Sequence, residues 1–72
     1  MRTTAKQRQF IINCDVENIV SILHNEYGIP LVEAFSKVYN SQLYDTLTNT
    51  RNGLFIQSPL YQFEYLKEEL GL

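Results

Sequence analysis

The sequence is poor in several residue types on which particular folds and functions depend. It has one cysteine, which excludes a disulfide within the chain, and one histidine, which excludes a His–His metal pair or a Ser-His-Asp triad built from this chain alone. Its three glycines stand far apart, so there is no glycine-rich phosphate-binding loop. No apolar run approaches the roughly 18 residues of a membrane span. We therefore expect no cofactor, no metal centre, no small-molecule substrate and no membrane segment.

Charge is also scarce. Charged residues make up 19% of the 72 residues, and the net charge is -2. A nucleic-acid-binding protein usually has a basic stripe that neutralises phosphates. The one basic cluster here is Arg2, Lys6 and Arg8, which forms either a solvated first turn or a small arm that touches an acidic partner or a phosphate backbone. These features argue against nucleic acid as a partner.

The beginning of the chain has no apolar segment of the kind that a secretory signal peptide contains. Together with the single cysteine, this predicts a protein of the reducing cytoplasm.

Apolar residues recur at spacings of three and four, which is the pattern of helices that bury one face. Gly28 and Gly71 are suited to end helices, and Pro30, Ser41 and Ser58 are suited to begin them. These signals predict a single all-α domain, a compact bundle over residues 1–72, with four helices at about 4–27, 30–39, 41–49 and 58–70. The asparagines around residue 13 leave a break in the first helix as an alternative.

The last two predicted helices are joined by a turn and a short apolar run. Asn52-Gly53 is a strong turn signal, and the residues at 54–57 that follow it are predicted to form an extended connector. In the second helix Leu31 is expected on the apolar face. In the last helix the inward positions are predicted to be Leu60, Phe63, Leu66 and Leu70.

The residues that could take part in catalysis do not form a recognisable catalytic set. His24 is expected at the solvent edge of the first helix, and Cys14, which has an acidic neighbour and no nearby cation, is expected to be a buried, inert thiol. Glu64, Glu68 and Glu69 are predicted to form a solvated outer face of the last helix, with an acidic docking strip as the alternative. A small enzyme would require His24 or these carboxylates to converge in a pocket.

Tyrosine is abundant for a chain of this size. A buried tyrosine needs a partner for its hydroxyl, so several of the five should lie at the boundary of the core. They form either a rim around the core or a protein-contact surface, because tyrosine is enriched where proteins bind one another. The apolar run Leu54–Ile56, which is expected to be exposed, adds to the second interpretation, because an extended strand can pair with another chain. The candidate partner-contact residues are Tyr39, Tyr44, Leu54, Phe55, Ile56, Tyr61 and Tyr65.

From about Ile12 onward the chain resembles a family of small helical proteins of bacteria, chiefly gut anaerobes. The likeness is carried by four stretches and one further tyrosine, namely Tyr39-Asn40-Ser41-Gln42-Leu43-Tyr44, Gly53-Leu54, Gln57-Ser58-Pro59, Tyr65-Leu66-Lys67, and Tyr61. Members of that family are encoded near toxin–antitoxin-type genes, some beside genes for ADP-ribosyltransferase-like proteins. The resemblance implies a partner-binding role and no catalytic residue.

These observations together predict a non-enzymatic protein-interaction module, an antitoxin-like or accessory subunit that covers a partner's surface. Two alternatives stay open. One is a structural homodimer, in which the first helix buries its second apolar side against a second copy. The other is a weak nucleic-acid-binding regulator.

Overall fold

The computed structural model describes residues 4–72, with only the backbone at Thr50, so Arg2 of the basic cluster lies outside the described residues. Within this range the chain is all-α, as predicted, and contains no strand. Four α-helices and two short 3-10 helices follow one another as α1 (Ala5–Tyr27), α2 (Leu31–Tyr39), α3 (Gln42–Thr48), η1 (Thr50–Asn52), η2 (Leu54–Ile56) and α4 (Pro59–Leu70).

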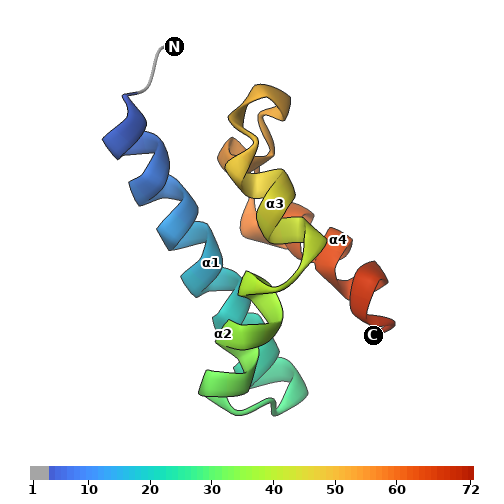
Figure 1. Cartoon of the computed structure of the whole chain (residues 1–72). Coiled ribbons are helices and arrows are strands. Elements are labelled where there is room, and N and C mark those ends of the chain that lie inside the picture. The colour runs from blue at the N-terminus through green and yellow to red at the C-terminus, as the bar shows by residue number, and fades with distance from the viewer. Residues whose placement is uncertain (1–3) are drawn as a thin grey trace.

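The long helix α1 sets the shape of the molecule. Its 23 residues span about 34 Å at 1.5 Å per residue, close to the longest of the three principal extents, which are 37, 20 and 19 Å. Helix α2 turns back beside the C-terminal half of α1, and α3 continues away from it (Figure 1). Helix α4 then returns behind α3 and also contacts α1 (Figure 1).

Helix α1 is continuous, so the alternative of a break near residue 13 does not occur. Its start is a capping box, in which the Thr4 hydroxyl accepts from the Gln7 amide at 3.1 Å and the Gln7 side chain accepts from the Thr4 amide at 2.8 Å. Asn13 points outward and accepts a hydrogen bond from Gln9 one turn earlier. Its weak helix propensity is outweighed by the apolar stripe packed on the other side.

A left-handed glycine separates α1 from α2. Gly28 has φ 69°, and its amide and that of Ile29 donate to the last carbonyls of α1. Pro30 is the residue before the first turn of α2 rather than its first member. The prediction that Leu31 faces the core is wrong: the buried residues of α2 are Ala34 and Val38, and Leu31, the first residue of the helix, is 49% exposed.

The prediction of an extended connector at 54–57 is also wrong. Leu54–Ile56 is a 3-10 turn, and only Gln57 has extended backbone angles. The Asn52 side chain stabilises this compact path, because its Nδ2 donates to the Thr46 carbonyl at 3.1 Å and its Oδ1 accepts from the Leu54 amide at 2.9 Å. Leu54 and Phe55 can therefore bury their side chains rather than lie along the surface.

Helix α4 begins as predicted, with Ser58 as the N-cap followed by Pro59. Its buried face is rotated from the predicted one. Gln62, Phe63 and Leu66 are buried, whereas Leu60 is 69% exposed, so its assignment to the core is wrong. Since Gln62 occupies an inward position, the centre of the buried face lies too far round the helix for Leu60 to reach it.

The core lies where α1, α2, α3, η2 and α4 meet. The core is closed near the C-terminal end of α1 by Tyr27 and Phe63, whose ring centroids are 5.8 Å apart. No helix among the described residues has both the length and the apolar character needed to cross a membrane. Thirteen buried apolar residues form the core, namely Ile12, Val16, Ile19, Val20, Leu23, Ala34, Val38, Leu43, Leu47, Leu54, Phe55, Phe63 and Leu66.

Candidate partner-binding surface

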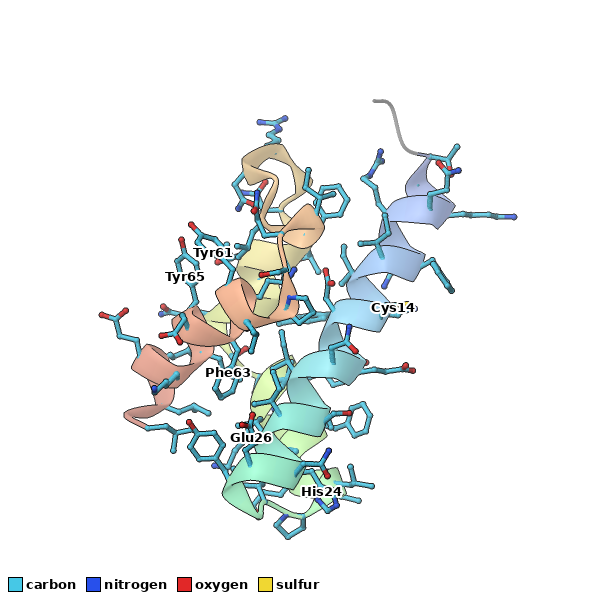
Figure 2. All side chains as sticks on the ribbon, turned by 180° about the vertical axis from the view of Figure 1, so that it is seen from behind. Cys14, His24, Glu26, Tyr61, Phe63 and Tyr65 are labelled. Atoms are coloured by element: carbon cyan, nitrogen blue, oxygen red, sulfur yellow. The ribbon has the colours of Figure 1, made fainter. Side chains whose placement is uncertain are left out.

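Two tyrosines stand side by side on the outer face of α4. The Ser58 cap accepts from the Tyr61 amide at 3.2 Å, which starts the helix so that Tyr61 and Tyr65 lie one turn apart. They are 51% and 48% exposed, and their rings meet edge to face with centroids 5.7 Å apart. The hydroxyls are 3.4 Å apart, and this hydrogen bond to Tyr61 raises the pKa of Tyr65. Figure 2 shows both side chains projecting together from α4.

Beside the tyrosine pair is an open hollow of about 590 Å³, which we call the α4 groove. Two smaller hollows of about 180 and 270 Å³ also include Tyr65 and extend towards α3 and η2 through Thr46. Tyr65 thus lines all three, and it is the residue that joins them. The α4 groove is lined by Tyr61, Glu64, Tyr65, Lys67, Glu68 and Leu72.

The charge of the α4 groove is mainly negative. Glu64 and Glu68 are exposed, and Lys67, which is half-buried, is the single cation of its lining. Glu69 lies on the same helix but has a structural role, because its carboxylate accepts from the Gln42 and Leu43 amides at 2.9 and 3.2 Å. The prediction of a solvated face therefore holds for Glu64 and Glu68, whereas Glu69 caps the start of α3.

The other two candidate tyrosines form a separate cluster on α2 and α3. The Tyr39 ring lies 5.0 Å from the Tyr44 ring in an edge arrangement and 6.2 Å from the Phe35 ring in a stacked one, measured between centroids. Tyr39 is exposed, and Tyr44 is half-buried. These rings fill the junction between the two helices, which agrees best with the rim interpretation.

The apolar run that was expected to be exposed does not provide a binding surface. Leu54 and Phe55 are each only 6% exposed and belong to the core, so the expectation that this run is exposed is wrong for both residues. The 3-10 turn at this point directs them inward, an arrangement that an alternating strand could not provide. Ile56 is the one residue of the three that remains exposed.

The chemically reactive residues lie apart from the tyrosine pair. Cys14 projects from α1 on the other side of the molecule, and His24 lies near the end of α1 (Figure 2). His24 is exposed, as predicted, and its Nδ1 donates to the Ile29 carbonyl at 2.8 Å. Cys14 is half-buried rather than buried, because it lies at the edge of the α1 stripe. Residues 4–72 bring no group of histidine, cysteine and carboxylate side chains together in a way that could hold a metal ion.

Two buried polar residues were missed at the sequence level. Asp15 and Gln62 lie between α1 and α4, where burial raises the pKa of Asp15 to about 6 and the Gln62 side chain partly opposes this rise. A signal was present, because Asp15 is three residues from Ile12 and four from Ile19, on the apolar row itself. The capping role of Glu69 had no such signal, since its partners lie 26 and 27 positions earlier in the chain.

Comparison of the chain with protein-family models, with curated proteins and with solved structures gave no match. The interpretation of the α4 groove therefore depends on its own geometry and charge.

Proposed function

We propose that this protein is a non-enzymatic protein-interaction module and that its partner binds at the α4 groove. The observation that carries the proposal is the exposed pair of Tyr61 and Tyr65, which already contact each other beside an open hollow. Tyrosine rings supply a large contact area and have few rotatable bonds, so little conformational entropy is lost when a partner covers them.

The lining of the groove favours a partner segment that carries arginine or lysine. A cation can lie over the face of a tyrosine ring while neighbouring carboxylates neutralise it. Glu64 and Glu68 line the groove and can neutralise such a cation, and Lys67 offsets only part of their negative charge. Binding of such a segment would weaken as salt is added.

Within the cell, we assign the protein the role of an antitoxin-like or accessory subunit in the bacterial cytoplasm. Its small size and the resemblance to families encoded near toxin–antitoxin-type genes support this role. Such a subunit acts by covering a surface of its partner and needs no catalytic group. The products of the adjacent genes are therefore the first partners to test.

Site-specific photocrosslinking tests the proposal. p-Benzoylphenylalanine would replace Tyr65 in the groove or, as a matched control, Phe10, an exposed aromatic residue on α1. Each tagged variant is irradiated together with the purified product of an adjacent gene. We expect a discrete adduct from position 65 that Glu64→Gln and Glu68→Gln together reduce several-fold. Equal adducts from both positions, or no adduct with any of the neighbouring gene products, would contradict the proposal.

A structural homodimer is the second candidate, favoured by two adjacent apolar side chains of α2. Leu31 and Val32 are both exposed, and Val32 is the most exposed of the large apolar residues described, at 84%. Sedimentation velocity at micromolar concentration separates the two candidates. A dimer that Val32→Ser converts to a monomer would support self-association, and a monomer at every concentration would exclude it.

A further inference from the structure

The outer face of α4 repeats the same combination of side chains one helical turn apart. Tyr61 stands three positions before Glu64, and Tyr65 stands three positions before Glu68, so each tyrosine has a glutamate beside it on the helix surface. All four side chains are exposed and line the α4 groove. We call these two combinations the Tyr–Glu pairs. Four positions separate them, which is about 6 Å along the helix axis.

The carboxylates of the Tyr–Glu pairs have no cation beside them. Among the described residues, neither Glu64 nor Glu68 takes part in an ion pair or a side-chain hydrogen bond, and Lys67 of the same groove pairs with neither. Two like charges one turn apart on a helix repel each other. A cation bound at each carboxylate would remove this repulsion, so the charge of this face is complementary to that of a basic partner.

The tyrosine rings favour the guanidinium group of arginine over the ammonium group of lysine. The two rings meet at 71°, edge to face, so each keeps a face that the other ring does not cover. A planar guanidinium can stack on such a face while its fork of N–H groups reaches the neighbouring carboxylate. An ammonium group is a compact, strongly hydrated charge and cannot stack in this way.

The helical backbone beneath the groove determines which kind of segment fits. The described residues contain no strand, so an extended segment would find no sheet edge on which to pair its own amides and carbonyls. A helix pairs these groups internally, and its residues i and i+4 are also about 6 Å apart along the axis. A helix that lies along α4 therefore matches the spacing of the Tyr–Glu pairs.

We propose that the α4 groove binds a partner helix with two arginines four positions apart, each of which stacks on one tyrosine and pairs with the glutamate beside it. Tyr61 and Glu64 receive one arginine, and Tyr65 and Glu68 receive the other. This inference rests on the proposed function, because it specifies the partner segment that occupies the same groove.

The test uses three short alanine-rich peptides, each held helical by a hydrocarbon staple on the face away from the charged residues. The first carries two arginines four positions apart, the second carries two arginines two positions apart, and the third carries two lysines four positions apart. All three have the same net charge. Fluorescence anisotropy of the labelled peptides with the wild-type protein at low salt measures the affinities. The first peptide should bind about threefold to tenfold more tightly than either of the others.

Variants of the protein connect this preference to the Tyr–Glu pairs. Glu64→Gln and Glu68→Gln should each remove most of the advantage of the first peptide over the second, because one arginine then has no carboxylate partner. Glu17→Gln is the matched control, since it removes the same charge from an exposed position on α1. It should leave the advantage unchanged, and an equal loss in all three variants would overturn the proposal.

The outcomes separate this inference from the proposed function. Equal binding of the two arginine peptides, or of the arginine and lysine peptides at the same spacing, would overturn the inference and leave a basic partner at the groove. If none of the peptides binds while a photocrosslinker at position 65 still captures a neighbouring gene product, the inference alone also fails. If no peptide binds and no adduct forms, the proposed function fails as well.

Discussion

At the scale of single residues, two polar side chains of α4 hold distant parts of the chain together. Gln62 binds the carbonyls of Leu54 and Gln57, and Glu69 binds the first amides of α3 with both carboxylate oxygens. Both interactions satisfy backbone groups that helix ends and turns leave unpaired. One helix thus fastens α3 and η2 by hydrogen bonds as well as by packing.

Replacing Glu69 with Gln should destabilise the protein by about 1 kcal/mol, because a charge-assisted cap at the positive end of α3 becomes a weaker neutral one. For a chain of this size this corresponds to a fall in the melting temperature of roughly 4–8 °C. Glu68→Gln is the matched control, since Glu68 is exposed and belongs to the α4 groove. A fall of the same size in both variants would refute the capping role.

At the scale of elements, α4 has two faces with different tasks. Its inner face packs Phe63 and Leu66 against the core, and its outer face carries Tyr61 and Tyr65. The rotation that buries Gln62 also determines which residues are displayed. The 3-10 turns before α4 allow this rotation, because they shorten the connection and bury Leu54 and Phe55.

The assignment of the α4 faces predicts a large loss of stability for one leucine truncation and almost none for another. Leu66→Ala should cost about 2–5 kcal/mol, since it leaves a cavity at a fully buried site. Leu60→Ala should change the free energy of unfolding by no more than about 0.5 kcal/mol, because Leu60 is exposed. Urea denaturation measures both values, and comparable losses would show that the helix is rotated differently.

The turn between α3 and α4 provides a second prediction at this scale. Asn52→Ala removes the side-chain bonds to the Thr46 carbonyl and the Leu54 amide and should cost about 1–2 kcal/mol. Asn49→Ala is the control, because Asn49 makes no side-chain cap bond to η1. Amide hydrogen exchange should also become faster at Leu54 in the first variant only. Unchanged exchange there would contradict the proposed role of Asn52.

At the scale of the whole molecule, stability and protonation are linked through the junction between α1 and α4. The pKa of Asp15 is about 6 in the folded chain against 3.8 for an ordinary aspartate, so the folded state binds the proton more tightly. This contribution to stability is fully present below pH 3.8, is lost as the pH rises to about 6, and stays lost above it.

The wild-type protein should therefore lose on the order of 1–3 kcal/mol of stability through Asp15 between pH 4 and pH 7. The quantity to measure is the difference in the free energy of unfolding between D15N and the wild type, because other carboxylates titrate equally in both. That difference should grow steadily across this range. A constant difference would mean that Asp15 keeps an ordinary pKa.

The helices and their ends follow from local features of the sequence. Thr4, Ser41 and Ser58 begin helices, and Gly28 and Gly71 end them, with the four main segments close to where the spacing predicts them. These features are predictable because a cap or a helical turn joins residues no more than about five positions apart. The exposure of Tyr61 and Tyr65 was anticipated in the same way, from the cost of burying two hydroxyls.

Which faces turn inward and which distant groups meet depends on how the helices pack against one another. Leu60 lies outside the core and Gln62 inside it, Leu54 and Phe55 enter the core, and Glu69 reaches an amide 27 positions earlier. Amphipathic spacing defines a stripe but leaves its rotation open by tens of degrees, and the shape of the neighbouring helices selects one setting. The α4 groove and the contact of Asp15 with Gln62 both follow from that selection, because each depends on residues that only folding brings together.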